Sequence, residues 1–397
     1  MLIASLSGPD VYAEDETLLI RAARIFDGYV MRNDAGVLLR DGKVAKIDSA
    51  DAFEDEATST LDLGDATLLP GFIELHAHLN FQQVPADVVL RHGVTTLRDV
   101  GGPLHPPHGG DGRLRVMTSG PIITAPMGYP IPSLGETDIA LAVADEEQAR
   151  ETVQKLVAGG AAVIKVALEP GGEAGAPWSG GHGHHHVGHA ALEGHEQMAM
   201  HEKPAHWPLL PEIVVKAIVD EAHRLDRKVA AHVAEARGAQ IALNAGVDEW
   251  AHTPCEELPD ELLKRAAVQG VKIVSTLDTL SKCPGVAGNV RRLAALGAEF
   301  LYGAEIAHPD IPWGIDGQEL LHLQHLAGMQ PIDVLRAATS NAGRYLNMPL
   351  LGTLQPGAPA DLIAVKGDPL HKLKLLEYPD LVISGGKVVV DSFSDTN

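Results

Sequence analysis

The sequence has little cysteine, no long apolar run and no obvious export signal. Its two cysteines, Cys255 and Cys283, make a disulfide framework unexpected and a reducing compartment the default. No apolar run reaches the ~18–20 residues that a membrane-spanning helix requires. The first residues are acidic and lack the basic start and apolar core of a signal peptide. We therefore expect a soluble, cytoplasmic protein.

Positive charge is also scarce. The chain has 31 Lys and Arg against 53 Asp and Glu, which gives a net charge of −22. Nucleic acids and anionic membranes attract basic surfaces, so this balance argues against both as partners. The sequence leaves a homo-oligomer open. A length of 397 residues, 45% of them hydrophobic, fits one large domain together with a smaller structural unit.

Both ends of the chain read as short strands with tight turns. Residues 17–69 contain two apolar runs, and Asp41-Gly42 between strand-like segments is a hairpin signal. Residues 360–365 and 380–390 are rich in β-branched side chains. These patterns predict one small sheet domain built from both termini. Separate terminal hairpins are the alternative.

The middle of the chain alternates between two patterns. Short apolar strands are expected at the end of 68–78 and at 94–97, 114–117, 162–166, 228–232, 247–252, 271–274 and 299–302. Helix-period stretches lie between several of them, at 146–158, 211–225, 260–268 and 289–296. Eight strand–helix units over about 275 residues predict an α/β fold with a (β/α)8 TIM barrel. An open doubly wound sheet is the runner-up, disfavoured because no Gly-x-Gly-x-x-Gly follows a first strand.

Four histidines lie at the ends of expected strands. His76 and His78 follow an apolar run after a Pro-Gly turn, and their i, i+2 spacing puts both on one face of a strand. His232 and His252 end the fifth and sixth expected strands. In a barrel the chemistry lies at the carboxyl ends of the strands, so the four could share one metal site. If His76 and His78 are considered alone, the alternative is that they are two histidines at a solvated strand end.

Lys165 lies inside the apolar strand 161–168. Burying an ammonium can shift its pKa by ~3–5 units unless it is paired or neutralised. An ion pair with an acidic side chain would offset the cost of burying this ammonium, and so would its conversion to an uncharged or anionic group.

Several motifs together resemble one known family. They are Pro-Gly-Phe-Ile-Glu-Leu-His-Ala-His at 70–78, and the segments 92–102, 161–165, 230–232, 249–252, 335–342 and 352–363. The chain resembles the imidazolonepropionase-like and Xaa-Pro-dipeptidase-like branch of the amidohydrolase superfamily from about residue 17 to 390.

This resemblance implies a barrel over 69–346 and a β-sandwich domain assembled from 1–68 and 347–397. It also implies two divalent metal ions, usually Zn²⁺, bridged by a carbamylated Lys165. The remaining ligands would be His76, His78, His232 and His252.

The chain departs from the family pattern in two places. The eighth strand of the family ends in Gly-Thr-Asp, whereas this chain has Gly303-Ala-Glu305, with a carboxylate one methylene longer. We expect Glu305 to be a metal ligand, the catalytic base, or both. The segment 119–129 replaces the Gly-Gly-His-Gly of dipeptidase-like members, so dipeptidase specificity does not carry over. Tyr129 and His308 are the candidate substrate-binding residues.

One segment is peculiar to this chain. Residues 182–206 contain eight histidines in 25 positions. Such a tract can gather metal ions, and a surface loop with incidental histidines is the alternative.

The function predicted from these residues is metal-assisted hydrolysis of an amide or other C–N bond in a small-molecule or short peptide-like substrate. In this mechanism Glu305 moves the proton from the attacking water to the leaving nitrogen. Cleavage of a C–C, ester or lactone bond by the same site is the alternative reaction. A non-catalytic metal-binding protein is the alternative class.

Overall fold

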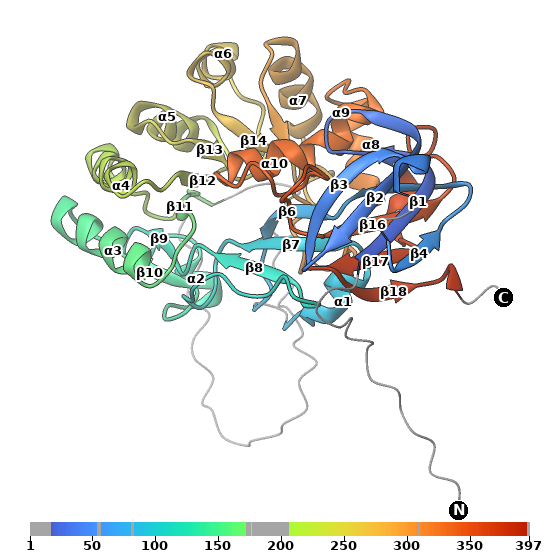
Figure 1. The fold of residues 1–397 in the computed structure, drawn as a ribbon. Coiled ribbons are helices and arrows are strands. Elements are labelled where there is room, and N and C mark those ends of the chain that lie inside the picture. The colour runs from blue at the N-terminus through green and yellow to red at the C-terminus, as the bar shows by residue number, and fades with distance from the viewer. Residues whose placement is uncertain are drawn as a thin grey trace, which may run out of the picture.

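A computed structural model describes residues 17–53, 57–80, 83–171, 176, 206–308 and 310–394. Strands from both ends of the chain share one sheet, in the order β18-β17-β16-β5-β1-β2-β3, with β4 beside β1 (Figure 1). The strands are β1 (Thr17–Phe26), β2 (Met31–Arg40), β3 (Lys43–Ser49), β4 (Ser59–Asp62), β5 (Ala66–Pro70), β16 (Leu362–Lys366), β17 (Leu381–Ser384) and β18 (Lys387–Asp391). The predicted joining of the two termini in one sheet is confirmed.

The hairpin expected at Asp41-Gly42 forms between β2 and β3. Both residues have left-handed backbones, with φ of 52° and 70°. This is the pairing of dihedral angles that a two-residue turn needs to match the twist of its strands.

The middle of the chain forms parallel sheets in a TIM-barrel-like α/β arrangement. One has the order β6-β7-β8, and the other β10-β9-β11-β12-β13-β14-β15. Their bounds are β6 (Phe72–Ala77), β7 (Val94–Asp99), β8 (Arg115–Thr118), β9 (Ile122–Thr124), β10 (Ala140–Ala142), β11 (Ile164–Leu168), β12 (Val229–Val233), β13 (Glu249–Trp250), β14 (Lys272–Val274) and β15 (Phe300–Leu301). The eight predicted strands are present. The short β9 and β10 were not predicted, because three-residue strands carry too little periodicity.

Helices flank these strands (Figure 1). They are α1 (Ala86–Arg91), α2 (Ile131–Leu134), α3 (Glu146–Ala158), α4 (Glu212–Arg224), α5 (Ala236–Ala245), α6 (Asp260–Gln269), α7 (Val286–Ala295), α8 (Gly317–His325), α9 (Pro331–Ala337) and α10 (Ser340–Tyr345), with 3-10 turns η1 (Ala50–Phe53) and η2 (Leu373–Glu377). Helix α4 shows why they pack there. Its Val214, Val215 and Ile218 recur at helical spacing and join the same buried cluster as Ile164 and Val229 of the strands.

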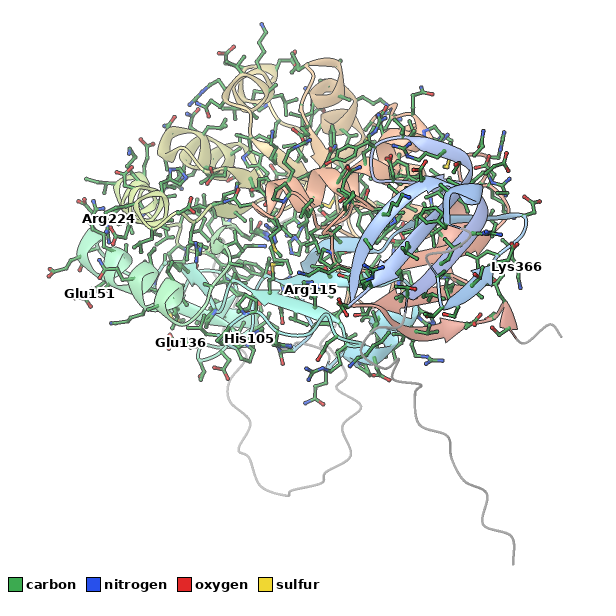
Figure 2. The ribbon with its side chains drawn as sticks, in the orientation of Figure 1. His105, Arg115, Glu136, Glu151, Arg224 and Lys366 are labelled. Atoms are coloured by element: carbon green, nitrogen blue, oxygen red, sulfur yellow. A yellow bond between two sulfur atoms is a disulfide. The ribbon has the colours of Figure 1, made fainter. Side chains whose placement is uncertain are left out.

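The terminal sheet leads directly into the parallel strands. Gly71 alone separates β5 from β6, and a Cβ at this position would lie 2.2 Å from the Thr95 side chain. A second link is the ion pair of Arg115 on β8 with Asp361 before β16, at 3.0 Å (Figure 2). The terminal sheet and the parallel strands are therefore joined both by the chain at Gly71 and by an ion pair.

The two cysteines correct one prediction. Cys255 and Cys283 form a disulfide with a Cα–Cα distance of 5.0 Å. It joins the loop after β13 to the loop after β14, which the sequence could not foresee because these loops meet only in the fold. Among the described residues, no helix has both the length and the apolar character needed to cross a membrane. The compartment and the oligomeric state stay predictions.

Candidate metal centre

The carboxyl ends of three strands bring histidines and a carboxylate together. His76 is the second-last residue of β6, and His78 follows the strand; their Nε2 atoms are 3.2 Å apart. His252 follows β13, and its Nδ1 lies 3.4 Å from Oε2 of Glu305, which follows β15. Oε1 of Glu305 lies 3.8 Å from Nε2 of both His76 and His78. One ligand atom each from His76, His252 and Glu305 lies within 4.8 Å of the others, a group that could hold a metal ion.

The other two predicted ligands lie beside this group. Lys165 Nζ on β11 is 3.4 Å from His76 Nε2. The ring of His232 on β12 is centred 4.6 Å from that of His252. All six residues predicted as ligands are buried and lie in one cluster. Their roles as ligands stay a prediction.

The imidazoles are held in the form that binds metal. Burial, followed by the charge of Lys165, lowers the pKa of His76 and His78 well below the usual range for histidine. Burial and then His232 lower the pKa of His252 in the same direction. A neutral imidazole offers a nitrogen lone pair. His76 donates from Nδ1 to the Ala251 carbonyl at 2.7 Å, which leaves Nε2 for a ligand.

Lys165 is also poised to be uncharged. Burial lowers the pKa of its ammonium to about 7, and the nearby Glu305 only partly offsets this effect. A substantial fraction of Lys165 is therefore a neutral amine at neutral pH, the form that can react as a nucleophile.

The donor set fits a divalent ion such as Zn²⁺. Imidazole nitrogen and carboxylate oxygen are its common ligands. Oε2 of Glu305 is buried and accepts no hydrogen bond from any residue that the structure describes. A buried carboxylate oxygen without a donor is costly, and a bound cation would satisfy it.

The backbone at and just after Glu305 is unusual. Glu305 has a φ of 63° and Ala307 a φ of 103°, in the left-handed region that non-glycine residues avoid. Such conformations cost on the order of 1–3 kcal/mol and cluster at functional sites. His308, predicted to contact substrate, lies with Nε2 3.1 Å from Oε1 of Glu305. In this structure its neighbour is therefore the carboxylate that we predict to be catalytic.

Tyr129 lies at one side of the centre. Its ring is 5.0 Å from that of His232 and stacks on Trp207 at 5.3 Å with an interplanar angle of 23°. Sequence reasoning missed Trp207, because it reaches Tyr129 from 78 positions along the chain. It also missed Glu169, whose Oε2 lies 3.6 Å from Nε2 of His232.

Glu74 is a third residue that sequence reasoning missed. It is fully buried on β6 and accepts hydrogen bonds from the backbone N–H groups of His76 at 2.7 Å and Ala304 at 2.9 Å. Burial raises the pKa of Glu74 to about 8, although both hydrogen bonds act against that rise. A carboxylate inside an apolar strand was the available signal. The histidine tract lies outside the described residues except for His206.

The fold and the site together define a TIM-barrel-like α/β protein with a buried, metal-compatible centre at its strand ends. The sequence profile of the Amidohydrolase family matches residues 67–389, and the chain belongs to this family. By family it is a hydrolase, as the motifs predicted.

Individual proteins are also similar to this chain in sequence or in fold. Ochratoxinase of Aspergillus niger is 33% identical over 193 residues, which span 44% of this chain and 40% of that protein. The chain thus aligns with less than half the length of this curated relative. Its fold resembles that of a solved Xaa-Pro dipeptidase with a TM-score of 0.74, 21% identity, and coverage of 94% of this chain and 99% of that one. The solved A. niger ochratoxinase gives a TM-score of 0.74, 21% identity and 96% coverage of both chains. These two solved structures share the fold of this chain.

Proposed function

We propose that this amidohydrolase hydrolyses an amide or other C–N bond in a small-molecule or short peptide-like substrate, with divalent metal ions as cofactors. The observation that carries the proposal is the convergence of His76, His252 and Glu305 within 4.8 Å at the strand ends. The names of the relatives, an ochratoxinase and an Xaa-Pro dipeptidase, support small substrates. The segment 119–129 gives no support for dipeptidase specificity.

Two ions, with Zn²⁺ best suited to the donor set, would be held by His76, His78, His232, His252, Glu305 and a carbamylated Lys165. When bound, such ions lower the pKa of water toward ~7 and polarise a carbonyl oxygen. The family supports this metal dependence.

The burial of Lys165 supports its carbamylation. The neutral Nζ attacks the carbon of CO₂, an N–C bond forms, and one C–O π bond becomes a lone pair on oxygen. Nζ then releases a proton, so the side chain ends as an anion. The reaction replaces a buried cation, which burial disfavours, with a group that cations stabilise.

Glu305 would move the proton. Its Oε1 is held 3.1 Å from His308 Nε2, which leaves Oε2 to accept a proton from the attacking water. Oε2 would then return that proton to the leaving nitrogen. The left-handed backbone at Glu305 aims the longer side chain at the histidines.

The two parallel sheets would form one closed (β/α)8 barrel over 69–346, with 1–68 and 347–397 as a β-sandwich domain. Two contacts between the sheets support closure. Ala77 and Ile306 form a parallel bridge, and the Ala162 N–H donates to the Thr118 carbonyl at 2.8 Å.

The test combines metal analysis with a substrate screen. Purified full-length protein should contain about two transition-metal ions per chain. It should hydrolyse a member of a panel of cyclic amides, N-acyl amino acids, dipeptides and modified peptides. His76→Ala should lose both metal and turnover, whereas Glu151→Gln, a surface change on α3, should lose neither. Full metal occupancy in His76→Ala would remove His76 from the ligand set. Many loosely held ions without turnover would return the protein to the metal-binding class.

A further inference from the structure

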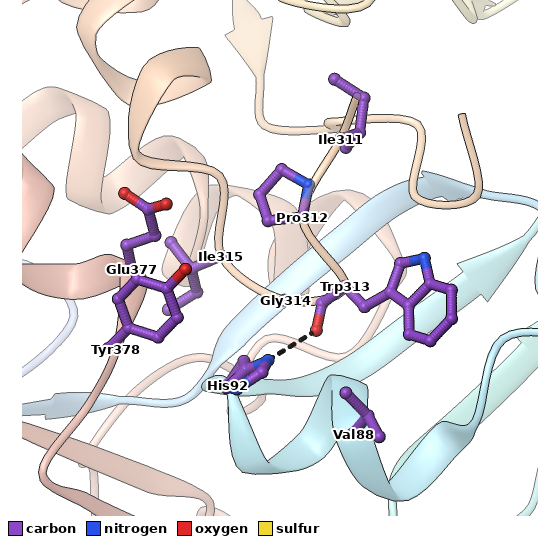
Figure 3. Close-up of a pocket in the computed structure, with 9 residues that line it drawn as sticks. All are labelled: Val88, His92, Ile311, Pro312, Trp313, Gly314, Ile315, Glu377 and Tyr378. Carbon is purple, nitrogen blue, oxygen red and sulfur yellow. Dashed lines mark hydrogen bonds between the residues drawn. The ribbon is translucent and has the colours of Figure 1, made fainter. Parts of the chain in front are cut away.

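The structure also contains a pocket with a volume of about 380 Å³. Three segments form it: α1 with His92 just after it, residues 311–315 between β15 and α8, and the end of η2 with Tyr378 (Figure 3). None of the residues described as metal-centre neighbours lines it. The proposed hydrolysis therefore leaves this pocket without a role.

The walls of the pocket are aromatic and apolar. Trp313 is 40% exposed and Tyr378 is 66% exposed, and both line this one hollow. Single exposed aromatic side chains are ordinary, but two of them at one concave site are typical of a surface that contacts a ligand. Figure 3 shows the Trp313 indole at one side and the Tyr378 ring at the other, with Ile315 and Pro312 between them.

The pocket is stiffened by contacts through His92. Nδ1 of His92 donates to the Trp313 carbonyl at 3.1 Å, and the His92 carbonyl accepts from the Ile315 N–H at 3.1 Å. The ring of His92 also meets Tyr378 edge-on, with centroids 5.5 Å apart. Gly314 lets the backbones approach, since a Cβ there would lie 2.2 Å from the His92 Cβ. The site is thus largely formed before any ligand arrives, which lowers the cost of binding.

The charge of the pocket is negative. Glu377 is its one acidic lining residue, and no lysine or arginine lines it. Across the described part of the chain, no basic side chain forms an ion pair with Glu377. A half-buried carboxylate beside aromatic faces attracts organic cations, because both the charge and the ring quadrupoles favour a positive group.

We propose that this pocket binds a small organic cation with an apolar or aromatic body, such as a protonated arylalkyl amine. The ammonium would face the Glu377 carboxylate and the Tyr378 ring. The apolar body would lie along Pro312 and Ile315 toward Trp313. Residues 311–315 follow Glu305 in the connection between β15 and α8, so the ligand would contact the segment that carries the proposed base.

The test uses 2-phenylethylamine and full-length protein in a ligand-observed NMR titration at pH 7.5. We expect saturable binding with a dissociation constant on the order of 1 mM, as a ligand of this size allows. The neutral analogue 2-phenylethanol should bind about threefold to fivefold more weakly, because the charge contribution at a partly exposed site is modest.

Two variants locate the binding site. Glu377→Gln should weaken amine binding about threefold to fivefold and bring it to the level of the alcohol. Trp313→Leu should weaken both ligands, because it removes the aromatic wall. Glu151→Gln removes the same charge from α3 and should leave binding unchanged. Far-UV circular dichroism checks that each variant is folded.

Three results would overturn the proposal: no saturable binding to the wild-type protein, equal binding of amine and alcohol, or unchanged amine affinity in Glu377→Gln and Trp313→Leu. The metal content and hydrolysis of these variants should match wild type. Failure here would therefore leave the proposed hydrolase function standing.

Discussion

Glu305 stands where the family pattern that this chain resembles has an aspartate. A carboxylate one methylene longer cannot reach the same point from the same backbone. In this chain Glu305 has a left-handed φ of 63°, and its Oε1 lies 3.1 Å from His308 Nε2. Coordination distances tolerate only ~0.2 Å, so such adjustment is required of any ligand of altered length.

Substitution of Glu305 should therefore separate chemistry from folding. Glu305→Gln keeps the shape but cannot accept a proton, and kcat/KM on the substrate found by the screen should fall ~10²- to 10⁴-fold. Glu305→Asp should also be impaired, though less. Aspartate accepts a left-handed backbone more readily than most residues, so the loss would reflect reach and not strain.

Circular dichroism and metal analysis provide the controls for both variants. A near wild-type rate for Glu305→Gln would mean that Glu305 is structural. His308 and Asp310 would then be the next candidates for the base.

Asp99 should make stability depend on pH. Burial raises its pKa from 3.8 to about 7, although hydrogen bonds from Asn80 and Gly101 partly oppose the rise. In the unfolded chain Asp99 loses its proton near pH 3.8, whereas in the folded protein it keeps the proton up to about pH 7. The folded state therefore binds more protons between these values, and the stability from Asp99 falls as pH rises from about 4 to 7.

Asp99→Asn removes this titration while it keeps the shape of the side chain and an acceptor for Asn80. When the pH is raised from 5 to 8, the free energy of unfolding of the wild type should fall by about 1–3 kcal/mol more than that of the variant. Urea unfolding at several pH values, at fixed metal content, measures the difference. Parallel pH profiles for the two proteins would show that Asp99 does not titrate as described.

At the scale of elements, β7 and β13 are joined by a buried ion pair. Arg98 donates to Glu249 through Nη1 at 3.0 Å and Nη2 at 2.6 Å, and its Nε donates to the Leu75 carbonyl at 2.7 Å. Both side chains are almost inaccessible to solvent. Two strands 151 positions apart are thus fixed on one another below the site.

Replacing one residue of this ion pair should destabilise the protein more than replacing both. Glu249→Leu or Arg98→Met leaves an uncompensated buried group and should cost about 3–5 kcal/mol in free energy of unfolding. The double variant Arg98→Met with Glu249→Leu should recover a large part of that loss. Chemical unfolding of the four proteins completes the double-mutant cycle. Strictly additive losses would mean that the pair is not coupled.

At the scale of the whole molecule, metal and fold should be coupled. The proposed ligands come from strands spread between residues 76 and 305, so a bound ion would favour the folded chain over the unfolded one. Stripping the metal with a chelator should lower Tm by several degrees, and adding back Zn²⁺ should restore it. Scanning calorimetry measures both steps.

His76→Ala is the matched control for this experiment, because its Tm should respond little to either treatment. An identical Tm for wild-type protein before and after chelation would contradict a metal site that spans these strands.

The sequence by itself determined the elements and the residue types at the site. Strands such as 94–97 and helices such as 146–158 are encoded by local periodicity and end where turn residues interrupt it. His76, His78, Lys165, His232, His252 and Glu305 were visible because each is a polar residue at the end of, or within, an apolar strand. A local pattern fixes which residues end strands, since it depends only on near neighbours.

Only the tertiary structure decided which distant groups meet. It paired Cys255 with Cys283 and stacked Trp207 on Tyr129. It also brought Glu74 within hydrogen-bond distance of the Ala304 N–H, gave Glu305 its left-handed backbone, and formed the pocket between Trp313 and Tyr378. Each of these contacts joins loops or strand ends whose separation depends on how the sheets assemble, or, at Glu305, on a strain that the surrounding packing sustains. No local propensity contains that information, because the free energy that fixes it comes from burial shared across the whole fold.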